Sequence, residues 1–260
     1  MSLVGKTFAS YFKDLFHIGN SNNGVDASTR NVKDGLGNST SISLSDDVLS
    51  VQPVNHNTTG TLLCKTDGGD NILAVDTQNY KVKVGSSQVN ATTMIKEMGL
   101  YDFSPSVAGY HYPLIANTMF VPTGATAFAA DNDWGNGTDP ATTLDVSGLT
   151  APANAIAVYW YLQNNITLDE VRYLATADAS DALTLHLFAY TIDTSTNHGD
   201  LSTGVVHANA SVSATSTTIK TGTFTLDKAN IDANKVVIGF VESDSTTDLS
   251  VAFQIKYHIR

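Results

Sequence analysis

One stretch of the sequence places oxygen-bearing side chains close to an aromatic ring. Residues 131–139 read Asp-Asn-Asp-Trp-Gly-Asn-Gly-Thr-Asp. Carboxylate and amide oxygens are the ligands that calcium prefers, although Gly135 stands at a ligand position of the EF-hand pattern and Thr142 replaces its bidentate glutamate. An exposed indole among such side chains could instead stack on a sugar ring, and the third interpretation is a long loop with the indole turned inward. The candidate residues are Asp131, Asp133, Trp134, Asn136 and Asp139.

The remaining titratable residues do not form a catalytic pattern. Seven histidines are spread over the chain, and no two have metal-ligand spacing. His186 alternates with leucines, which predicts a position on the polar face of a strand. Asp169 and Glu170 are adjacent, so in a strand they point to opposite faces and make no general acid/base pair. Nucleophile-elbow, P-loop and dinucleotide-binding motifs are absent. We therefore expect no catalytic residue, no cofactor beyond a loop calcium and no enzyme activity.

The composition predicts an all-β chain. Charged residues make up only 15% and hydrophobic residues 42%, and the polarity comes from Ser, Thr, Asn and Gly. Hydroxyl and amide side chains favour turns and compete with helix hydrogen bonds. The net charge of -11 is uneven, because residues 1–103 hold eight Lys/Arg against ten Asp/Glu and residues 104–260 hold six against fifteen. Such a surface repels phosphate backbones, so nucleic acid is not an expected partner.

The cysteine count and the length of the apolar segments exclude a fold stapled by intrachain disulfides and a membrane-spanning helix. Cys64 is the single cysteine, so no intrachain disulfide can form. It lies in the apolar run 61–64, which predicts a small buried hydrophobe. No apolar run approaches the ~20 residues of a membrane-spanning helix, so we expect no membrane insertion.

The first residues have the pattern of an amphipathic helix. Apolar side chains recur at helical spacing over residues 1–18 and form one stripe. Each large aromatic side chain would gain about 1.5–3 kcal/mol on burial, and a short N-terminus offers little core. We hypothesise that this segment is an anchor that docks on another protein; the alternative is packing on its own chain or on symmetry mates. The stripe consists of Val4, Phe8, Tyr11, Phe12, Leu15 and Phe16.

Residues 19–98 predict short strands joined by tight turns. Asn23-Gly24, Asp34-Gly35 and Asp67-Gly68 are turn signals, and short apolar runs lie between them, with strands at 71–76 and 81–84. A short helix is expected over 92–98. Tyr80 is the only aromatic residue between Phe16 and Tyr101. So little apolar material cannot build a generous core, so we expect several chains to associate here.

The second half predicts a β-sandwich. Residues 99–118 have the composition of a linker, and from residue 119 to residue 260 strand patterns follow at intervals of ~8–12 residues. Residues 183–190 and 251–257 alternate clearly, and 236–241 form an apolar run that suits a central strand. Eight or so antiparallel strands fit a jelly roll.

Two segments resemble a known group of proteins. Residues 19–53, from Gly19 to Pro53, are similar to the N-terminal region of virion structural and fibre-like proteins of tailed bacteriophages, especially marine ones. Residues 72–85, Ile-Leu-Ala-Val-Asp-Thr-Gln-Asn-Tyr-Lys-Val-Lys-Val-Gly, resemble the short β-repeat of phage fibre shafts. That repeat usually continues Val-Gly-Ile-Gly-Thr after its turn, whereas this chain has Val82-Lys83-Val84-Gly85-Ser86, once and not in series.

The resemblance implies a location in the virion. The leading hypothesis is a homotrimeric fibre or spike that residues 1–18 attach to portal, tail or capsid proteins, with the sandwich facing outward toward host surface glycans. The alternative is a capsid decoration or cement protein that stabilises the head shell. A polysaccharide depolymerase is a third hypothesis, for which the sequence offers no paired carboxylates and no long β-helix.

Overall fold

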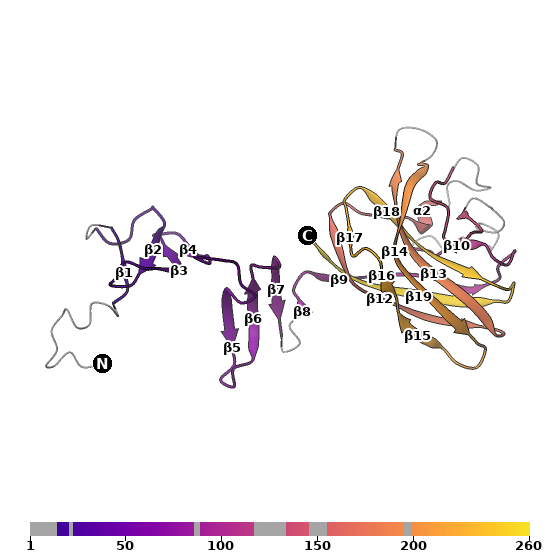
Figure 1. Ribbon diagram of the computed structural model, residues 1–260, viewed down its shortest axis with the longest axis horizontal. Helices are drawn as coiled ribbons and strands as arrows, with labels where there is room; N and C mark the ends of the chain where they lie inside the picture. The colour runs from indigo at the N-terminus through magenta and orange to yellow at the C-terminus, as the bar shows by residue number, and fades with distance from the viewer. Residues whose placement is uncertain (1–14, 21–22, 86–88, 117–133, 146–154, 195–198) are drawn as a thin grey trace. The chain divides into compact units, whose positions relative to one another are not determined.

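The chain forms two compact units with almost entirely β structure. The computed structural model describes residues 15–20, 23–85, 89–116, 134–145, 155–194 and 199–260. Unit 1 spans Met1–Thr92 and unit 2 spans Thr93–Arg260 (Figure 1). Within the described residues the regular helix is the single turn α2 (Ala155–Val158). The prediction of an all-β chain is confirmed.

Unit 1 contains two antiparallel sheets whose strands follow one another in sequence order. Turn chemistry fixes the hairpins: Asp34 accepts the backbone N–H groups of Leu36 and Asn38, each at 2.9 Å, and Gly37 takes a positive φ of 88°. The first sheet is β1 (His17–Ile18), β2 (Arg30–Lys33), β3 (Ser39–Leu44) and β4 (Leu49–Val51). The second sheet is β5 (Leu62–Lys65), β6 (Asn71–Asp76), β7 (Lys81–Val84) and β8 (Val89–Asn90). The strands predicted at 71–76 and 81–84 are confirmed.

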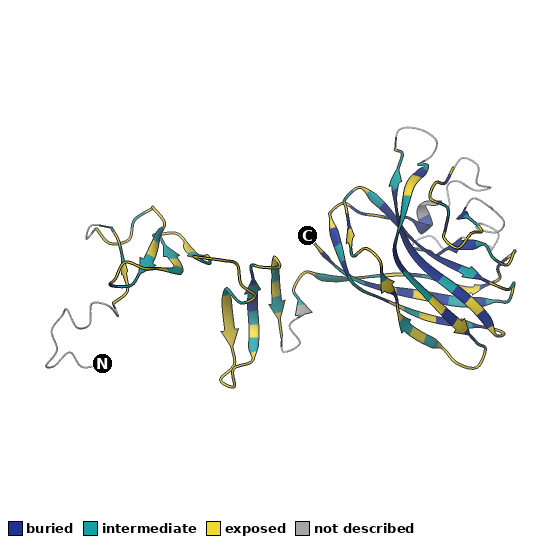
Figure 2. Cartoon of the chain, viewed as in Figure 1, coloured by how far each residue is buried: buried dark blue, intermediate teal, exposed yellow. Residues whose placement is uncertain are grey.

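Unit 1 has almost no interior. Among its described residues, Ala74 is the one buried hydrophobic side chain. Figure 2 shows both sheets as mostly intermediate and exposed residues. A side chain that stays in water contributes little of the ~25 cal/mol per Å² that apolar burial supplies. The two sheets are therefore held mainly by their backbone ladders and turns.

Unit 2 is built on two larger antiparallel sheets. One has the order β10-β18-β13-β14-β16 with β11 also paired to β18, and the other has the order β15-β12-β19-β9 with β17 also paired to β12. The strands are β9 (Thr93–Phe103), β10 (His111–Pro113), β11 (Trp160–Tyr161), β12 (Ile166–Ala177), β13 (Asp181–Ile192), β14 (Leu201–Ala214), β15 (Lys220–Thr223), β16 (Thr225–Leu226), β17 (Asn230–Ile231), β18 (Lys235–Ser243) and β19 (Leu249–Ile259).

The core of unit 2 lies between these sheets, as in a β-sandwich. Leu185 and Val241 from one sheet and Val171, Phe253 and Ile255 from the other belong to one cluster of buried side chains. Successive strand residues point to opposite faces, and such interdigitation of two inner faces is the ordinary packing of aligned sheets. The antiparallel sheets agree with the predicted β-sandwich, but the unit begins at Thr93 and not at residue 119.

A second, smaller core covers the other face of the β10-β18-β13 sheet. Along β18, Val237 and Val241 belong to the first cluster, while Val236, Ile238 and Phe240 belong to the second. Described residues of 134–145 and 155–159 close over this face, including Trp134, Leu144 and Val158. Because both faces are covered, β18 is buried over nearly its whole length, which explains its continuous apolar sequence.

Several local predictions are wrong. Residues 93–98 form the start of β9 instead of a helix, because pairing with β19 outweighs the helical spacing of Met94, Ile95 and Met98. The predicted linker 99–118 contains the rest of β9 and all of β10, which are parts of unit 2. Of the predicted helix over 1–18, residues 1–14 lie outside the described part of the chain, and His17–Ile18 are strand β1.

Candidate binding surfaces

The second sheet of unit 1 has one face made of apolar side chains. Cα partners in the sheet share a face, and the register pairs Leu62 with Val75, Val75 with Val82, and Leu73 with both neighbouring strands. We call this set the apolar face of the second sheet. It consists of Leu62, Cys64, Leu73, Val75, Val82 and Val84.

None of these six side chains is buried by the described residues. Leu62 is 41% exposed, Val82 and Val84 are similarly exposed, and Cys64 is also exposed. The prediction that Cys64 is a buried hydrophobe is therefore wrong within one chain. Six neighbouring apolar side chains that remain partly exposed form a candidate interaction surface.

The opposite face of the same sheet carries the charges. Lys83 forms an ion pair with the buried carboxylate of Asp76 at 2.7 Å, and Asn79 donates to that carboxylate from its backbone and its side chain. Burial alone would raise the pKa of Asp76, but the hydrogen bonds from Lys83 and Asn79 outweigh it and lower the pKa to about 2. The opposite face thus combines these charges with the exposed side chains of Leu63 and Ile72, whereas the six positions above carry no charge.

The first sheet of unit 1 has a similar but less uniform face. Ile42 pairs with Val51 and Leu44 pairs with Leu49, so these four side chains lie on one face. Leu49 is 67% exposed. Arg30 is the Cα partner of Leu44 and therefore lies on this face as well, where it forms a bidentate pair with Asp26.

Unit 2 carries a groove on its outer surface. Cross-strand partners form a row over three strands, from Gly99 to Ala252 and Leu174, and Ile115 extends the row through an isolated bridge to Gly99. The two middle positions, Gly99 and Ala252, have little or no side chain. At Gly99 a Cβ would lie 3.0 Å from the carbonyl oxygen of Val251, which disfavours a larger residue there. The result is a cavity of about 650 Å³, within the usual size range of ligand sites.

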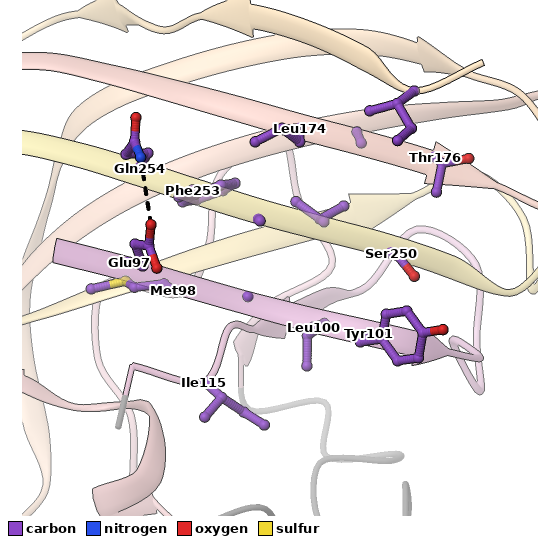
Figure 3. Close-up of a pocket in the computed structure, with 15 residues that line it drawn as sticks. Glu97, Met98, Leu100, Tyr101, Ile115, Leu174, Thr176, Ser250, Phe253 and Gln254 are labelled. Atoms are coloured by element: carbon purple, nitrogen blue, oxygen red, sulfur yellow. Dashed lines mark hydrogen bonds between the residues drawn. The ribbon is translucent and has the colours of Figure 1, made fainter. Parts of the chain in front are cut away.

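The groove has apolar walls and a polar rim. Leu174 and Ile219 line one side, and Tyr101, whose ring is 89% exposed, lines the other. Figure 3 shows Tyr101, Ser250 and Thr176 on three successive strands, with Ser250 in the middle, and Glu97 beside Gln254 on the neighbouring strand. Gln254 donates to Glu97 at 3.4 Å. Such a surface suits a ligand with both an apolar face and hydroxyl groups.

The structure settles one of the three interpretations of the 131–139 stretch. Trp134 is only 3% exposed and packs against Phe240, with ring centroids 5.6 Å apart. Its ring is therefore not available to stack on a sugar. Asn136 and Asp139 are exposed, while Asp131 and Asp133 lie outside the described residues, so a loop calcium remains a prediction. The described residues contain no group of three or more His, Cys, Asp or Glu side chains arranged to hold a metal ion.

Two histidines meet beside Trp134, which the sequence did not predict. His186 is 3% exposed instead of lying on a polar surface, and its ring centroid is 5.2 Å from that of His111. His111 Nδ1 lies 3.1 Å from the carbonyl oxygen of Gly135, and His186 Nδ1 lies 3.7 Å from Asp139. Burial is the main cause that lowers the pKa of His186 to about 4, and His111 adds to it. Both rings are therefore neutral at pH 7.

The adjacent carboxylates at 169 and 170 have structural partners. Asp169 accepts a hydrogen bond from His258 Nδ1 at 3.0 Å, and Glu170 pairs with Arg172 at 2.9 Å. They do not act together, in agreement with their positions on a strand.

The predicted anchor residues are mostly outside the described structure. Leu15 is 42% exposed and Phe16 is 70% exposed, and neither lies in a helix. Val4, Phe8, Tyr11 and Phe12 lie outside the described residues. Docking by this segment stays a prediction. The groove residues were missed from the sequence, where the one available signal was Gly99, a glycine inside a strand.

Comparisons with known proteins add little. No family model matches the sequence, and no curated protein matches it. Among solved structures, one similar chain is the Clostridium thermocellum N-terminal endo-1,4-beta-D-xylanase 10B, with its CBM22-1 and GH10 modules, complexed with xylohexaose. The identity is 15%, the TM-score is 0.24, and the match covers 39% of this chain and 18% of that one. A similarity of this size carries no argument about function. In the described part of the chain, no helix has the length and apolarity needed to span a bilayer.

Proposed function

We propose that this protein is a structural component of a tailed-phage virion, a homotrimeric fibre or spike whose N-terminal segment docks on the particle. The single observation that carries the proposal is the missing interior of unit 1. Two four-stranded sheets expose apolar side chains on defined faces, and Ala74 is the only buried hydrophobic side chain among the described residues there. The resemblance of residues 19–53 and 72–85 to phage fibre proteins agrees with this reading.

Association of copies supplies the burial that one chain lacks. A thin sheet is marginal in water unless its apolar face is covered, and small units commonly gain that cover by oligomerisation. Unit 2, with two buried clusters of its own, needs no such help. We propose that it is a jelly-roll-like sandwich facing outward, a type supported by consecutive strands such as β12 and β13 or β18 and β19 lying in different sheets.

Sedimentation equilibrium of the purified full chain tests the association. We expect a mass three times the 27.6 kDa of one chain. A chain that stays monomeric at all accessible concentrations would refute the proposal. Deletion of residues 1–18 should leave the oligomer intact and abolish incorporation into particles; normal incorporation would refute the docking role of that segment.

A head-decoration role is the second candidate, favoured by the same uncovered faces, which could clamp neighbouring shell subunits. Copy number separates the two roles. Quantitative mass spectrometry of purified virions should find few copies for a fibre and copies comparable to the shell subunit for a decoration protein. Release of reducing sugar from host polysaccharide would instead support a depolymerase.

We further propose that the groove of unit 2 binds host surface glycans. The exposed Tyr101 ring offers a face for the C–H side of a sugar, and Ser250, Thr176 and Gln254 offer hydrogen bonds. Tyr101→Ala should weaken adsorption to host cells. Tyr80→Ala is a matched control, because Tyr80 is equally exposed, at 90%, and lies in unit 1. Equal adsorption of the two variants would contradict glycan binding by the groove.

A further inference from the structure

The groove of unit 2 carries a negative charge that nothing nearby neutralises. Among the described residues that line it, Glu97 has the only charged side chain. Its carboxylate accepts a hydrogen bond from Gln254 on the neighbouring strand (Figure 3). No Lys, Arg or His of the described residues forms an ion pair with Glu97. A ligand in the groove therefore meets a carboxylate that has no cation of its own.

Carboxylates also gather at the other end of the groove. Thr176 and Ser250 line both the groove and a smaller adjoining hollow, and that hollow is also lined by Asp102, Asp178 and Asp248. Charges of one sign on a binding surface reject partners of the same sign. A ligand with carboxylate or phosphate groups would thus meet negative charge at both ends of the groove.

Two cations on the same outer face lie beside a carboxylate already. Arg172 follows Gln254 in the row of Cα partners and forms an ion pair with Glu170 at 2.9 Å. Lys256 is the Cα partner of the same Glu170. An anionic ligand would have to compete with Glu170 for either cation, so these residues do not turn the groove into an anion site.

The walls of the groove favour methyl groups over hydroxyl groups. Leu174 is 45% exposed and Ile219 is 66% exposed, and both line the groove. A sugar hydroxyl pressed against such side chains loses its hydrogen bonds to water and finds no partner, whereas a methyl group gains free energy when it leaves water. An acetamido group supplies that methyl together with an N–H, which a carboxylate such as that of Glu97 can accept.

We infer that the groove selects uncharged glycans whose sugars carry acetamido groups and rejects acidic glycans. This inference rests on the proposed glycan-binding function of the groove and names the class of sugar that the groove takes. The carboxylates reject the acidic sugars, and the apolar walls select the methyl groups.

Three tetrasaccharides with the backbone of cellulose test both halves of the inference, because they differ only in their substituents. Tetra-N-acetylchitotetraose carries acetamido groups, cellotetraose carries hydroxyl groups at the same positions, and the glucuronic acid tetramer carries carboxylates. Titration calorimetry with the full-length chain measures the three affinities. We expect the acetamido tetramer to bind at least ~10-fold more tightly than cellotetraose and the glucuronic acid tetramer to bind least tightly.

The opposite order would overturn the inference. Binding of the glucuronic acid tetramer or of cellotetraose as tight as that of the acetamido tetramer contradicts the selection, and so does a failure of all three to bind. Neither result decides whether the groove serves adsorption to host cells, which the Tyr101→Ala variant tests separately.

A substitution in the floor of the groove locates the binding. Ala252→Leu fills the floor and should weaken binding of the acetamido tetramer at least ~10-fold. Ala182→Leu is the matched control, because Ala182 is also an exposed strand alanine but lies on β13 in the other sheet. Tryptophan fluorescence during urea denaturation checks that both variants fold. Equal binding by two folded variants would overturn the assignment to the groove.

A substitution of the lining carboxylate tests the role of charge. Glu97→Gln keeps the length of the side chain and removes its charge. The affinity difference between the acetamido tetramer and the glucuronic acid tetramer should narrow several-fold in this variant. A difference as large as that of the wild-type chain would contradict rejection by charge.

Discussion

The two units of this chain solve the problem of apolar burial in different ways. In unit 2, two sheets face each other and a third layer, formed by described residues of 134–145 and 155–159, covers one of them, so β18 is buried on both faces. In unit 1, each sheet has an apolar face and no layer among the described residues covers it. Strand formation and core formation therefore have separate requirements. Turn chemistry and alternation are enough for a ladder, but only a second layer makes a core.

The largest difference between the units should appear when apolar side chains are shortened. Phe240 is fully buried and contacts Trp134, Phe188 and Tyr190. Phe240→Ala should lower the free energy of unfolding of unit 2 by about 3–5 kcal/mol. Leu49→Ala in unit 1 should change the stability of the dilute chain by under ~0.5 kcal/mol.

Urea denaturation followed by tryptophan fluorescence measures the first effect selectively, because both tryptophans, Trp134 and Trp160, lie in unit 2. Similar losses in the two variants, with hydrogen exchange used to follow unit 1, would erase the contrast between the units.

Acid should act on unit 2 through His186. Its pKa in the folded chain is about 4, below the ordinary value of 6.5, so the unfolded chain takes up the proton first as the pH falls. The stability that this neutral ring provides is complete above about pH 6.5 and is lost progressively as the pH falls toward 4, by about 3 kcal/mol in all.

The difference between wild type and His186→Gln isolates this contribution from that of Asp181, whose pKa burial raises. The variant should show a flatter dependence of unfolding free energy on pH between 6.5 and 4. His56→Gln, a change at an exposed residue of unit 1, should keep the wild-type slope. Parallel curves for wild type and His186→Gln would contradict the buried histidine pair.

The ion pair of unit 1 should have a smaller, local effect. Lys83→Met removes the partner of Asp76, so the pKa of that carboxyl should rise from about 2. Because the folded pKa lies below the unfolded value of 3.8, Asp76 stabilises the sheet above that pH and loses this effect as the pH falls to about 2. We expect a loss of ~1 kcal/mol at neutral pH.

NMR titration of the Asp76 carboxyl and hydrogen exchange of β6 and β7 measure the two consequences. An unchanged titration of Asp76 in the variant would show that Lys83 does not hold this carboxylate.

Much of the fold could be predicted from local patterns. The alternation of residues 183–190 and 251–257 gave β13 and β19, and the turn residues gave the hairpins of unit 1. Local patterns failed where distant segments decide. Residues 93–98 have the apolar spacing of a helix, and pairing with β19, far along the chain, makes them a strand. His186 alternates as a surface residue does, but a segment some fifty residues earlier covers its face.

The candidate site was harder to predict for the same reason. The groove exists because Gly99, Ala252 and Leu174 from three strands form one row, and no spacing within one segment shows that row. The acidic residues 131–139 suggest a ligand site because they are neighbours in sequence, whereas their tryptophan, Trp134, is part of a core. The lack of apolar material in residues 19–98, in contrast, is a property of the composition and can be predicted from the sequence alone.

Hydrogen–deuterium exchange of the full chain at high and low concentration tests the central claim most directly. At high concentration, the amides of β5, β6 and β7 should be protected. After dilution below the dissociation constant of the oligomer they should exchange rapidly, while those of β13 and β18 stay protected throughout. Equal and concentration-independent protection of both units in a monomer would contradict the claim that neighbouring chains complete unit 1.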